Sequence, residues 1–427
     1  MSTGRDVVVI GAGVIGCSIA YSFAKAGREV LVIDRAKGPG MGSTSASSAV
    51  VRFNYSTHTG VAAAWESRQA WSMWEDHLGG TDDGALARFH LTGGLVLDTP
   101  EIDAATTCRL FEQVGIPFER WTARDIRDRI PGLDPARYFP PKPVSSDEFW
   151  SPADGELGGI WTPDSGFVDD PSFAAHNLMV AARRHGAEFE FGSPVVAIEK
   201  RDQRAVGVRT PTERYSCDVL INVAGPHSTV INDMAGVTEE FRIRTRPLRQ
   251  EVHELPGDGH DHPLVADLDL GTYFRRTPAG NVLVGGAEPA CDPLQWLEDP
   301  DEFKTIPSHE VYEAQAYRAA RRLPDLVVPS APRGVVGVYD VSSDWVPIYD
   351  KTSLGGYFVA IGTSGNQFKN APVVGEFLHA IVSATEAGID HDQNPVEYKL
   401  ARTGVPVDLG DYSRLRDPAR TAGNVMG

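Results

Sequence analysis

The sequence predicts an α/β fold in which a parallel sheet is interleaved with a second domain, and three observations support this prediction. A strand, a glycine turn, a helix and a second strand follow one another within residues 5–34. Two later apolar runs, 218–226 and 356–362, also end in glycine turns and are typical of further strands of the same sheet. The β-rich stretches between them show no repeat and no long linker. The 427 residues therefore divide into two or three domains, built from separated pieces of the chain.

The charge balance excludes some classes of partner. Forty Lys and Arg face 58 Asp and Glu, a formal net charge of −18 that repels nucleic-acid phosphates and anionic membrane surfaces. Residues 7–24 carry no charge over about one membrane span, but they contain three glycines and follow Asp6 where a secretory signal has a basic start. We therefore expect a cytoplasmic protein that binds neither nucleic acid nor membrane.

The first unit of the chain has the spacing of a dinucleotide-binding βαβ unit. A β-branched run at 5–10 leads into Gly11-x-Gly13-x-x-Gly16 and an alanine-rich helical pattern up to Gly27. A second strand at 29–34 ends in Asp34, about twenty residues beyond the glycines, as this type of site requires. The complete order of elements makes the prediction much stronger than the glycines alone.

Each polar or small residue of this unit has a physical role. Gly11 permits the tight turn, Gly13 lets the backbone approach a pyrophosphate, and Gly16 lets the helix pack against the strand. The helix N-terminus offers free N–H groups to the phosphates, and Asp34 can accept both hydroxyls of a ribose. This spacing predicts a dinucleotide but does not distinguish FAD from NAD.

The remaining elements follow in order. Residues 38–48 form a loop rich in glycine, serine and threonine that can surround a ligand. Residues 62–78 have helical spacing, and we interpret their tryptophans as a stripe that faces the core. Further strand-like segments are 88–97, 195–199, 205–210, 219–222, 242–249, 271–276 and 281–285, and further helical patterns are 172–185, 307–323 and 373–384.

From about residue 6 to about residue 384 the chain resembles the D-amino-acid oxidase-like family of FAD-dependent oxidoreductases, in the branch of the sarcosine oxidases and related amine and amino-acid oxidoreductases. The motifs that carry this resemblance are Gly11-x-Gly-x-x-Gly16 with Asp34, Gly42-Ser-Thr-Ser-Ala46 leading to Val50-Val51-Arg52, Gly166-Phe-Val-Asp-Asp-Pro171, Ala224-Gly-Pro226, Thr272-Tyr-Phe-Arg275, Gly337-Val-Tyr-Asp340 with Asp344, and Gly362-Thr-Ser-Gly-Asn-Gln-Phe-Lys369.

The resemblance implies two domains. An FAD-binding Rossmann domain of the glutathione-reductase type would comprise residues 1–87, 160–235 and 334–390. A substrate domain built on a mainly antiparallel sheet would comprise residues 88–159 and 236–333. Residues 391–427 would form a C-terminal extension.

The resemblance also implies the chemistry. A C–H bond next to an amine nitrogen of an amine or N-substituted amino acid is oxidised by hydride transfer to flavin N5, and the imine is then hydrolysed. The electron acceptor is O2 or another molecule, because the lysine that this branch uses for oxygen activation has no clear counterpart around Asp267–Tyr273. Two alternatives remain: a flavin-carrying subunit of a larger electron-transfer complex, and an NAD-dependent dehydrogenase that shares the first motif alone. The oligomeric state is left open.

Several site residues follow from the resemblance. Arg52 falls where sarcosine oxidases place a carboxylate-binding arginine, and Lys369 where they place its partner lysine. Tyr339 stands where glycine and D-amino-acid oxidases have their carboxylate arginine, and Tyr273 belongs to one of the matching motifs. Gly337 stands at the place of the cysteine that bonds to the flavin, so we expect non-covalent FAD.

The expected cofactor contacts come from the matched loops and strand ends, and no metal site is expected. The expected cofactor-binding residues are Gly11, Gly13, Val14, Ile15, Gly16, Asp34, Arg35, Ser43, Thr44, Ser45, Val196, Ala224, Gly225, Gly362, Gly365, Asn366, Gln367 and Lys369.

Overall fold

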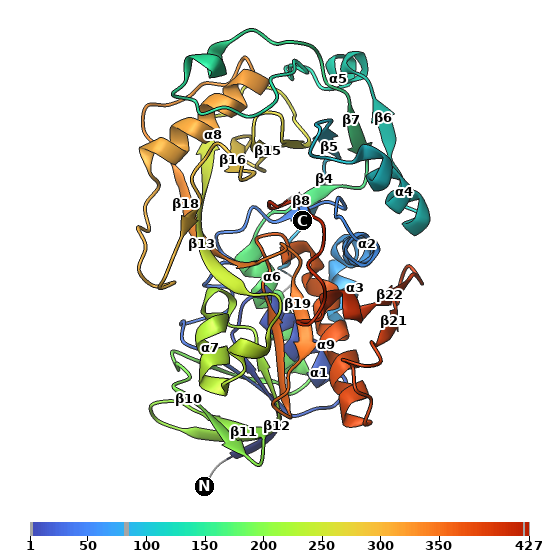
Figure 1. Cartoon of the computed structure of the whole chain (residues 1–427), viewed down its shortest axis with the longest axis vertical. Helices are drawn as coiled ribbons and strands as arrows, with labels where there is room; N and C mark the ends of the chain where they lie inside the picture. The colour runs from blue at the N-terminus through green and yellow to red at the C-terminus, as the bar shows by residue number, and fades with distance from the viewer. Residues whose placement is uncertain (1–2, 81–84, 422, 427) are drawn as a thin grey trace.

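The computed structural model describes residues 3–80, 85–421 and 423–426, and two large sheets lie one above the other along its long axis (Figure 1). The first sheet has the order β10 (Ala197–Arg201), β11 (Arg204–Arg209), β12 (Arg214–Asn222), β1 (Thr3–Ile10), β2 (Val30–Asp34) and β9 (Glu188–Phe191), with β20 (Tyr357–Ile361) and β19 (Ile348–Lys351) joined through β12. The second has the order β17 (Gln295–Trp296), β13 (Thr245–Leu255), β16 (Val282–Gly286), β15 (Thr272–Arg276), β14 (Leu264–Asp267), β5 (Gly94–Leu97), β7 (Gly159–Thr162) and β6 (Glu119–Trp121), with β18 (Gly334–Ser342) beside β13.

The parallel core of the first sheet explains its apolar strands. β1 pairs in parallel with both β2 and β12, and β12 pairs in parallel with β20. Val7 and Val9 belong to one buried apolar cluster and Val8 and Ile10 to another, because successive side chains of a strand point to opposite faces. With both faces covered, the strand ends become the place where polar chemistry can occur.

Helices cover this core and the second sheet. α1 (Val14–Lys25) packs against α6 (Pro171–Arg184) and α9 (Ala371–Glu386). The expected helix at 62–78 is two helices, α2 (His58–Ser72) and α3 (Trp74–Leu78), because Met73 leaves the helical conformation. The other helices are α4 (Ala104–Val114), α5 (Ala123–Arg129), α7 (Ser228–Ala235) and α8 (His309–Arg322).

The strand at the start of the predicted 334–390 piece, β18, belongs to the second sheet. β18, which the boundary at 334 assigns to the first domain, pairs antiparallel with β13 along its whole length. Residues 334–337 of β18 are half-exposed or exposed and residues 340–342 are buried, so pairing with β13, not the burial pattern, decides its sheet. The domain boundaries stay predictions.

Smaller elements connect the two parts. A three-stranded sheet of β3 (Val50–Val51), β8 (Gly166–Val168) and β4 (Phe89–Leu91) lies between them, and β3 leads directly into Arg52. Residues 391–427 carry β21 (Glu397–Lys399) and β22 (Pro406–Asp408), and buried Arg414 ties this segment to Asp350 at 3.0 Å. The last described residues, dark red in Figure 1, then return to the region between the two sheets.

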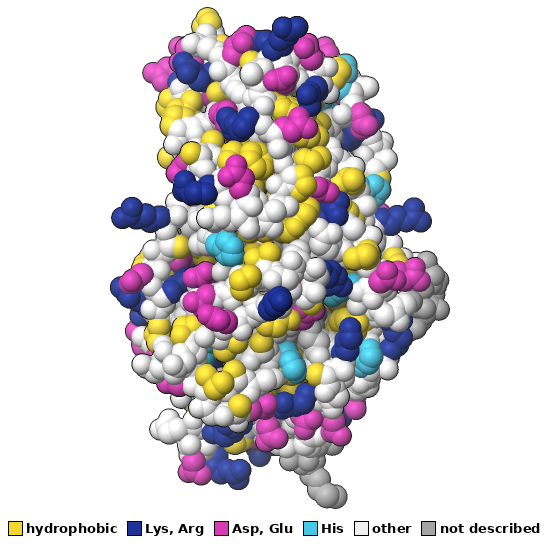
Figure 2. All heavy atoms as spheres, turned by 90° about the vertical axis from the view of Figure 1, so that its right-hand side faces the viewer, with side chains coloured by type: hydrophobic (Ala, Val, Ile, Leu, Met, Phe, Trp, Pro, Cys, Tyr) yellow, Lys and Arg dark blue, Asp and Glu magenta, His cyan; other side chains and the backbone are white. Residues whose placement is uncertain are grey.

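No helix among the described residues is long and apolar enough to cross a membrane. On the face shown in Figure 2, lysine and arginine side chains are interspersed with aspartate and glutamate. The cytoplasmic location expected from the sequence stays a prediction.

Candidate active site

The first glycine turn has room for glycine alone at two positions. A Cβ atom at Gly11 would lie 2.4 Å from the carbonyl oxygen of Val223, and one at Gly16 would lie 2.0 Å from the carbonyl oxygen of Gly11. Gly13 is the N-cap residue of α1 and has no side chain with which to cap the helix. The N–H of Val14 instead donates to the Thr44 hydroxyl at 3.1 Å. The first turn of α1, which includes Ile15, offers backbone N–H groups of the kind that a diphosphate site uses.

Asp34 is held beside this turn. Its carboxylate accepts hydrogen bonds from the backbone N–H groups of Ala12 at 2.6 Å and Ala36 at 2.7 Å. The carboxylate stands at the end of β2, next to the glycine turn, where a ribose would lie.

Two residues expected to bind the cofactor, Arg35 and Val196, do not lie in the glycine turn. The Arg35 guanidinium forms an ion pair with Asp301 at 2.5 Å, and Asp301 also contacts His227 at 3.1 Å. Val196 is 44% exposed and follows β9, the strand that pairs with β2. Contacts of these two side chains with a cofactor stay predictions.

The loop that follows β2 joins the two parts of the molecule. The Ser43 hydroxyl donates to the carbonyl oxygen of Val338 at 2.6 Å, and Ser45 closes the loop with a bond to the Gly42 carbonyl at 2.8 Å. A Cβ atom at Gly337 would lie 2.7 Å from that of Ala46. The loop therefore packs against β18 at a position that has neither a sulfur atom nor space for a side chain.

The later strand ends of the first sheet meet the first glycine turn from the other side. Ala224 packs against Gly11, and Gly225 has a positive φ of 57°. The N–H of Gly362 donates to Asp340 at 2.6 Å, and burial raises the pKa of Asp340 to about 7. Ser364 also has a positive φ, 47°, and strained backbone of this kind is enriched at functional sites.

Arg52 and Lys369 are buried close to each other without an acidic partner. Their exposed fractions are 6% and 3%, and neither forms an ion pair with any residue that the structure describes. Burial lowers the pKa of the Lys369 ammonium well below its usual value, and neighbouring Arg52 lowers it further. Burying an unpaired cation is costly, so a bound anion would stabilise the charged form of both side chains.

Tyr55 lies between these cations. Its ring centroid is 5.2 Å from the Arg52 guanidinium carbon and 5.3 Å from Lys369 Nζ, within the range of cation–π contact. Lys369 Nζ also donates to the Asn366 carbonyl at 2.7 Å. The side chain of Gln367 accepts a hydrogen bond from the Tyr349 hydroxyl at 3.1 Å.

The four residues expected to be catalytic line one pocket. Arg52, Tyr273, Tyr339 and Lys369 share this pocket with Ser47, Ser48, Gly365, Asn366, Val425 and others. The Tyr273 hydroxyl donates to the Ser48 hydroxyl at 3.0 Å, so the second sheet reaches the cofactor loop here. The pocket thus lies where the two sheets meet, and the roles of its residues stay predictions.

Sequence reasoning missed three residues of this pocket region. Tyr55 is three positions beyond Arg52 and has no motif of its own, while Glu288 and Val425 reach the site through the tertiary fold alone. Glu288 has a positive φ of 47°, which is uncommon for a residue other than glycine and can indicate a functional position. This feature is visible in the structure and not in the sequence.

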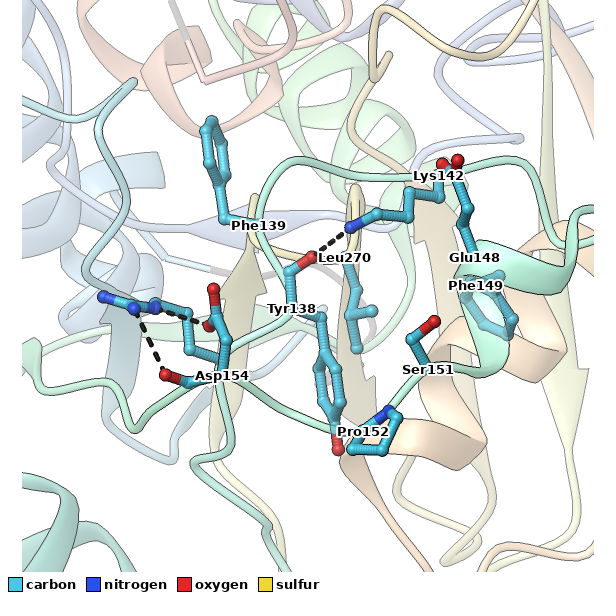
Figure 3. Close-up of a pocket in the computed structure, with 10 residues that line it drawn as sticks. Tyr138, Phe139, Lys142, Glu148, Phe149, Ser151, Pro152, Asp154 and Leu270 are labelled. Carbon is cyan, nitrogen blue, oxygen red and sulfur yellow. Dashed lines mark hydrogen bonds and ion pairs between the residues drawn. The ribbon is translucent and has the colours of Figure 1, made fainter.

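A second hollow lies on the second domain and is shown in Figure 3. Two of its cations have partners within the hollow: Lys142 Nζ donates to the Tyr138 carbonyl at 2.9 Å, and Arg137 Nε donates to Asp154 at 2.8 Å. Unlike the first pocket, it contains paired charges and no strand end of the parallel sheet.

Comparison with known proteins agrees with this geometry. The model of the family described as FAD dependent oxidoreductase matches residues 6–380. The chain belongs to this family of FAD-dependent oxidoreductases. The match spans nearly the whole chain, so it excludes a nicotinamide enzyme that shares the first motif alone. The glycine turn, Asp34 and the surrounding loops fit the dinucleotide part of FAD.

Two relatives of this oxidoreductase are named as oxidases of sarcosine and of 4-methylaminobutanoate. Monomeric sarcosine oxidase of Streptomyces avermitilis is 26% identical, over 88% of this chain and 93% of its own. The 4-methylaminobutanoate oxidase (formaldehyde-forming) of Paenarthrobacter nicotinovorans is also 26% identical, over 93% of this chain and 47% of its own.

Solved structures confirm the predicted fold class. L-proline dehydrogenase from P. horikoshii has a TM-score of 0.74 at 22% identity, with 91% of this chain and 95% of that chain covered. Glycine oxidase from Geobacillus kaustophilus has a TM-score of 0.72 at 19% identity, with 94% and 99% covered. At such identities the likeness concerns the fold alone.

Proposed function

We propose that this FAD-dependent oxidoreductase oxidises an amino acid or N-substituted amino acid to an imine, which water then hydrolyses to a carbonyl compound and an amine. FAD, when bound, supplies the acceptor for the hydride that leaves the carbon next to nitrogen. The protein's own task is to hold the substrate carbon at the flavin and to neutralise the substrate carboxylate.

The observation that carries the proposal is the pair of buried, acid-free cations Arg52 and Lys369 in one pocket. A carboxylate between them would accept the Arg52 fork and the Lys369 point charge, and it would remove the cost of burying both. The relatives named for sarcosine and 4-methylaminobutanoate support this choice, since both compounds carry an amine and a carboxylate.

Tyr273 and Tyr339 would shape the pocket above the flavin rather than bind the carboxylate. Burial raises the pKa of both phenols, so both stay neutral and act as hydrogen-bonding groups. Because these two side chains are neutral, the substrate carboxylate would bind at Arg52 and Lys369 and not beside the tyrosines.

The test is an anaerobic screen of amines against the purified holoenzyme, with the visible absorbance of oxidised FAD as the readout. We expect amino acids and N-methyl amino acids to bleach the flavin, and the matching amines without a carboxylate to bleach it much more slowly. Equal bleaching by both sets would contradict the carboxylate part of the proposal. No bleaching by any member would favour the alternative of a subunit that works only within a larger complex.

A further inference from the structure

Val425 lies in the pocket with both of its backbone polar groups engaged by side chains. Its carbonyl oxygen accepts a hydrogen bond from Arg52 Nη2 at 2.6 Å, and its N–H donates to Glu288 Oε2 at 2.8 Å. One residue of the chain's own 423–426 segment therefore bridges the candidate carboxylate-binding arginine and a carboxyl group on the opposite domain.

The side chains of this segment fill apolar spaces beside the pocket. Val425 belongs to a buried cluster with Leu248, Val341 and Trp345, and it is 8% exposed. Met426 belongs to another cluster that includes Ala266. The spaces on either side of the bridged backbone therefore accept branched or long apolar groups.

Glu288 is held in place by a second contact that is independent of Val425. Gln250 Nε2 donates to Glu288 Oε1 at 3.0 Å, which leaves Oε2 directed at the N–H of Val425. The positive φ of Glu288 indicates that the fold imposes this orientation at the expense of local backbone preference. Burial with little polar compensation raises the pKa of this carboxyl to about 8.

We infer that Arg52 and Glu288 form a two-point site for the N–Cα–C=O unit of an α-amino acid, and that Val425 occupies this site as an internal stand-in that the substrate displaces. The inference rests on the proposed function and narrows its substrate class. An α-amino acid offers a nitrogen and a carboxylate joined through one carbon, as Val425 does. An ω-amino acid separates the two groups too far to replace both bonds in the same way.

The charges of the substrate favour its replacement of Val425 at Arg52 and Glu288. An ionised carboxylate on Arg52 and an ammonium on Glu288 replace two hydrogen bonds in which the Val425 partners are neutral, and charge-assisted bonds are stronger. Lys369, whose Nζ donates to Tyr55 and to the Asn366 carbonyl, would gain the same carboxylate as a further partner. The substrate side chain would occupy the space left by that of Val425.

The test compares two ligands that differ by one amino group, 2-aminoisobutyrate and isobutyrate. Neither has a C–H bond on a carbon attached to nitrogen, so both bind to the holoenzyme without reacting, and flavin absorbance reports binding. Above about pH 8, where Glu288 is ionised, we expect the wild type to prefer 2-aminoisobutyrate by about tenfold or more. Glu288→Gln should lose most of that preference while it binds isobutyrate at least as well. Glu313→Gln, an exposed change on α8, is the matched control.

Hydrogen exchange at the amide of Val425 tests the stand-in separately. Saturating 2-aminoisobutyrate should accelerate this exchange in the wild type, because the bond to Glu288 is lost. Unchanged or slower exchange with bound ligand would show that 423–426 is a fixed wall, and an unchanged ligand preference in Glu288→Gln would remove Glu288 from recognition. Either result overturns the inference even where amino acids still bleach the flavin, so it is distinguishable from failure of the proposed function.

Discussion

Lys369 donates a hydrogen bond from its ammonium nitrogen to the hydroxyl oxygen of Tyr55 at 3.1 Å. The same ring faces the Arg52 guanidinium, so one aromatic residue spaces two buried cations that would otherwise repel each other. Neutral contacts of this kind lower the cost of burial but leave both charges uncompensated. A substrate carboxylate would complete the arrangement.

The glycine turn should tolerate no side chain at its third position. Gly16→Ala places a Cβ atom 2.0 Å from the Gly11 carbonyl, so the strand and helix must separate and the diphosphate amides must move. We expect loss of most bound FAD and destabilisation of about 1–3 kcal/mol, as for other overpacked sites. Gly4→Ala on β1, where the nearest atom lies at 3.6 Å, should retain FAD and serves as the control. Flavin content after purification and the midpoint of thermal unfolding measure both effects.

FAD should be released by denaturation. Gly337 has no sulfur and lies against Ala46, so this position cannot hold the flavin covalently. Acid precipitation should leave the yellow colour in the supernatant. Colour that stays with the protein pellet would show that another residue is attached to the flavin.

Reoxidation by air should be slow. Residues 264–288, which bring the second sheet to the pocket, contain no lysine that could activate oxygen beside the flavin. With a good substrate, an artificial electron-accepting dye should therefore turn the enzyme over much faster than O2 does. Peroxide formation at the same rate as dye reduction would mean that another group, unrecognised so far, activates oxygen.

Ligand binding should change with pH in opposite ways for the two matched ligands. The pKa of Glu288 is raised to about 8, so the group is neutral below that pH and ionised above it. Isobutyrate should bind more weakly as the pH rises through about 8, since ionised Glu288 then opposes its carboxylate, whereas the ammonium of 2-aminoisobutyrate gains a partner.

The other groups around Glu288 do not make the binding of the two ligands depend on pH in opposite ways. Gln250 does not titrate, burial raises the pKa of Tyr273 and Tyr339, and Arg52 stays cationic near neutral pH. Deprotonation of Lys369 would weaken both ligands alike. Over the pH range in which the ammonium of 2-aminoisobutyrate stays charged, the ratio of the two dissociation constants therefore isolates Glu288, and Glu288→Gln should make that ratio independent of pH.

The parts of the molecule that the sequence predicts are those whose determinants are local. The unit from β1 to β2 was predictable because Gly11, Gly16 and Asp34 act within 24 positions of one another, and their contacts follow from strand and turn geometry. The helix expected at 62–78 is divided because Met73 takes a conformation that the spacing of apolar residues does not reveal.

Residues whose neighbours are distant in the chain could not be placed in the same way. Val425 contacts Arg52 across 373 positions and Glu288 across 137. β18 has a pattern that suits either sheet, and pairing with β13 decides its place. No local rule connects such segments, since loop closure over those distances is set by the whole fold.

The most direct test of the central claim measures kcat/KM of Arg52→Ala and Lys369→Met with the best amino acid from the anaerobic screen and with the amine that lacks its carboxylate. Removing one partner of a buried charge pair costs about 2–5 kcal/mol. Each variant should therefore keep its FAD and lose about tenfold to several thousandfold in kcat/KM on the amino acid, but change little on the amine. Arg124→Ala, an exposed change on α5, should change neither. Normal turnover of the amino acid by both variants would contradict the account and make a neutral or cationic amine the better candidate substrate.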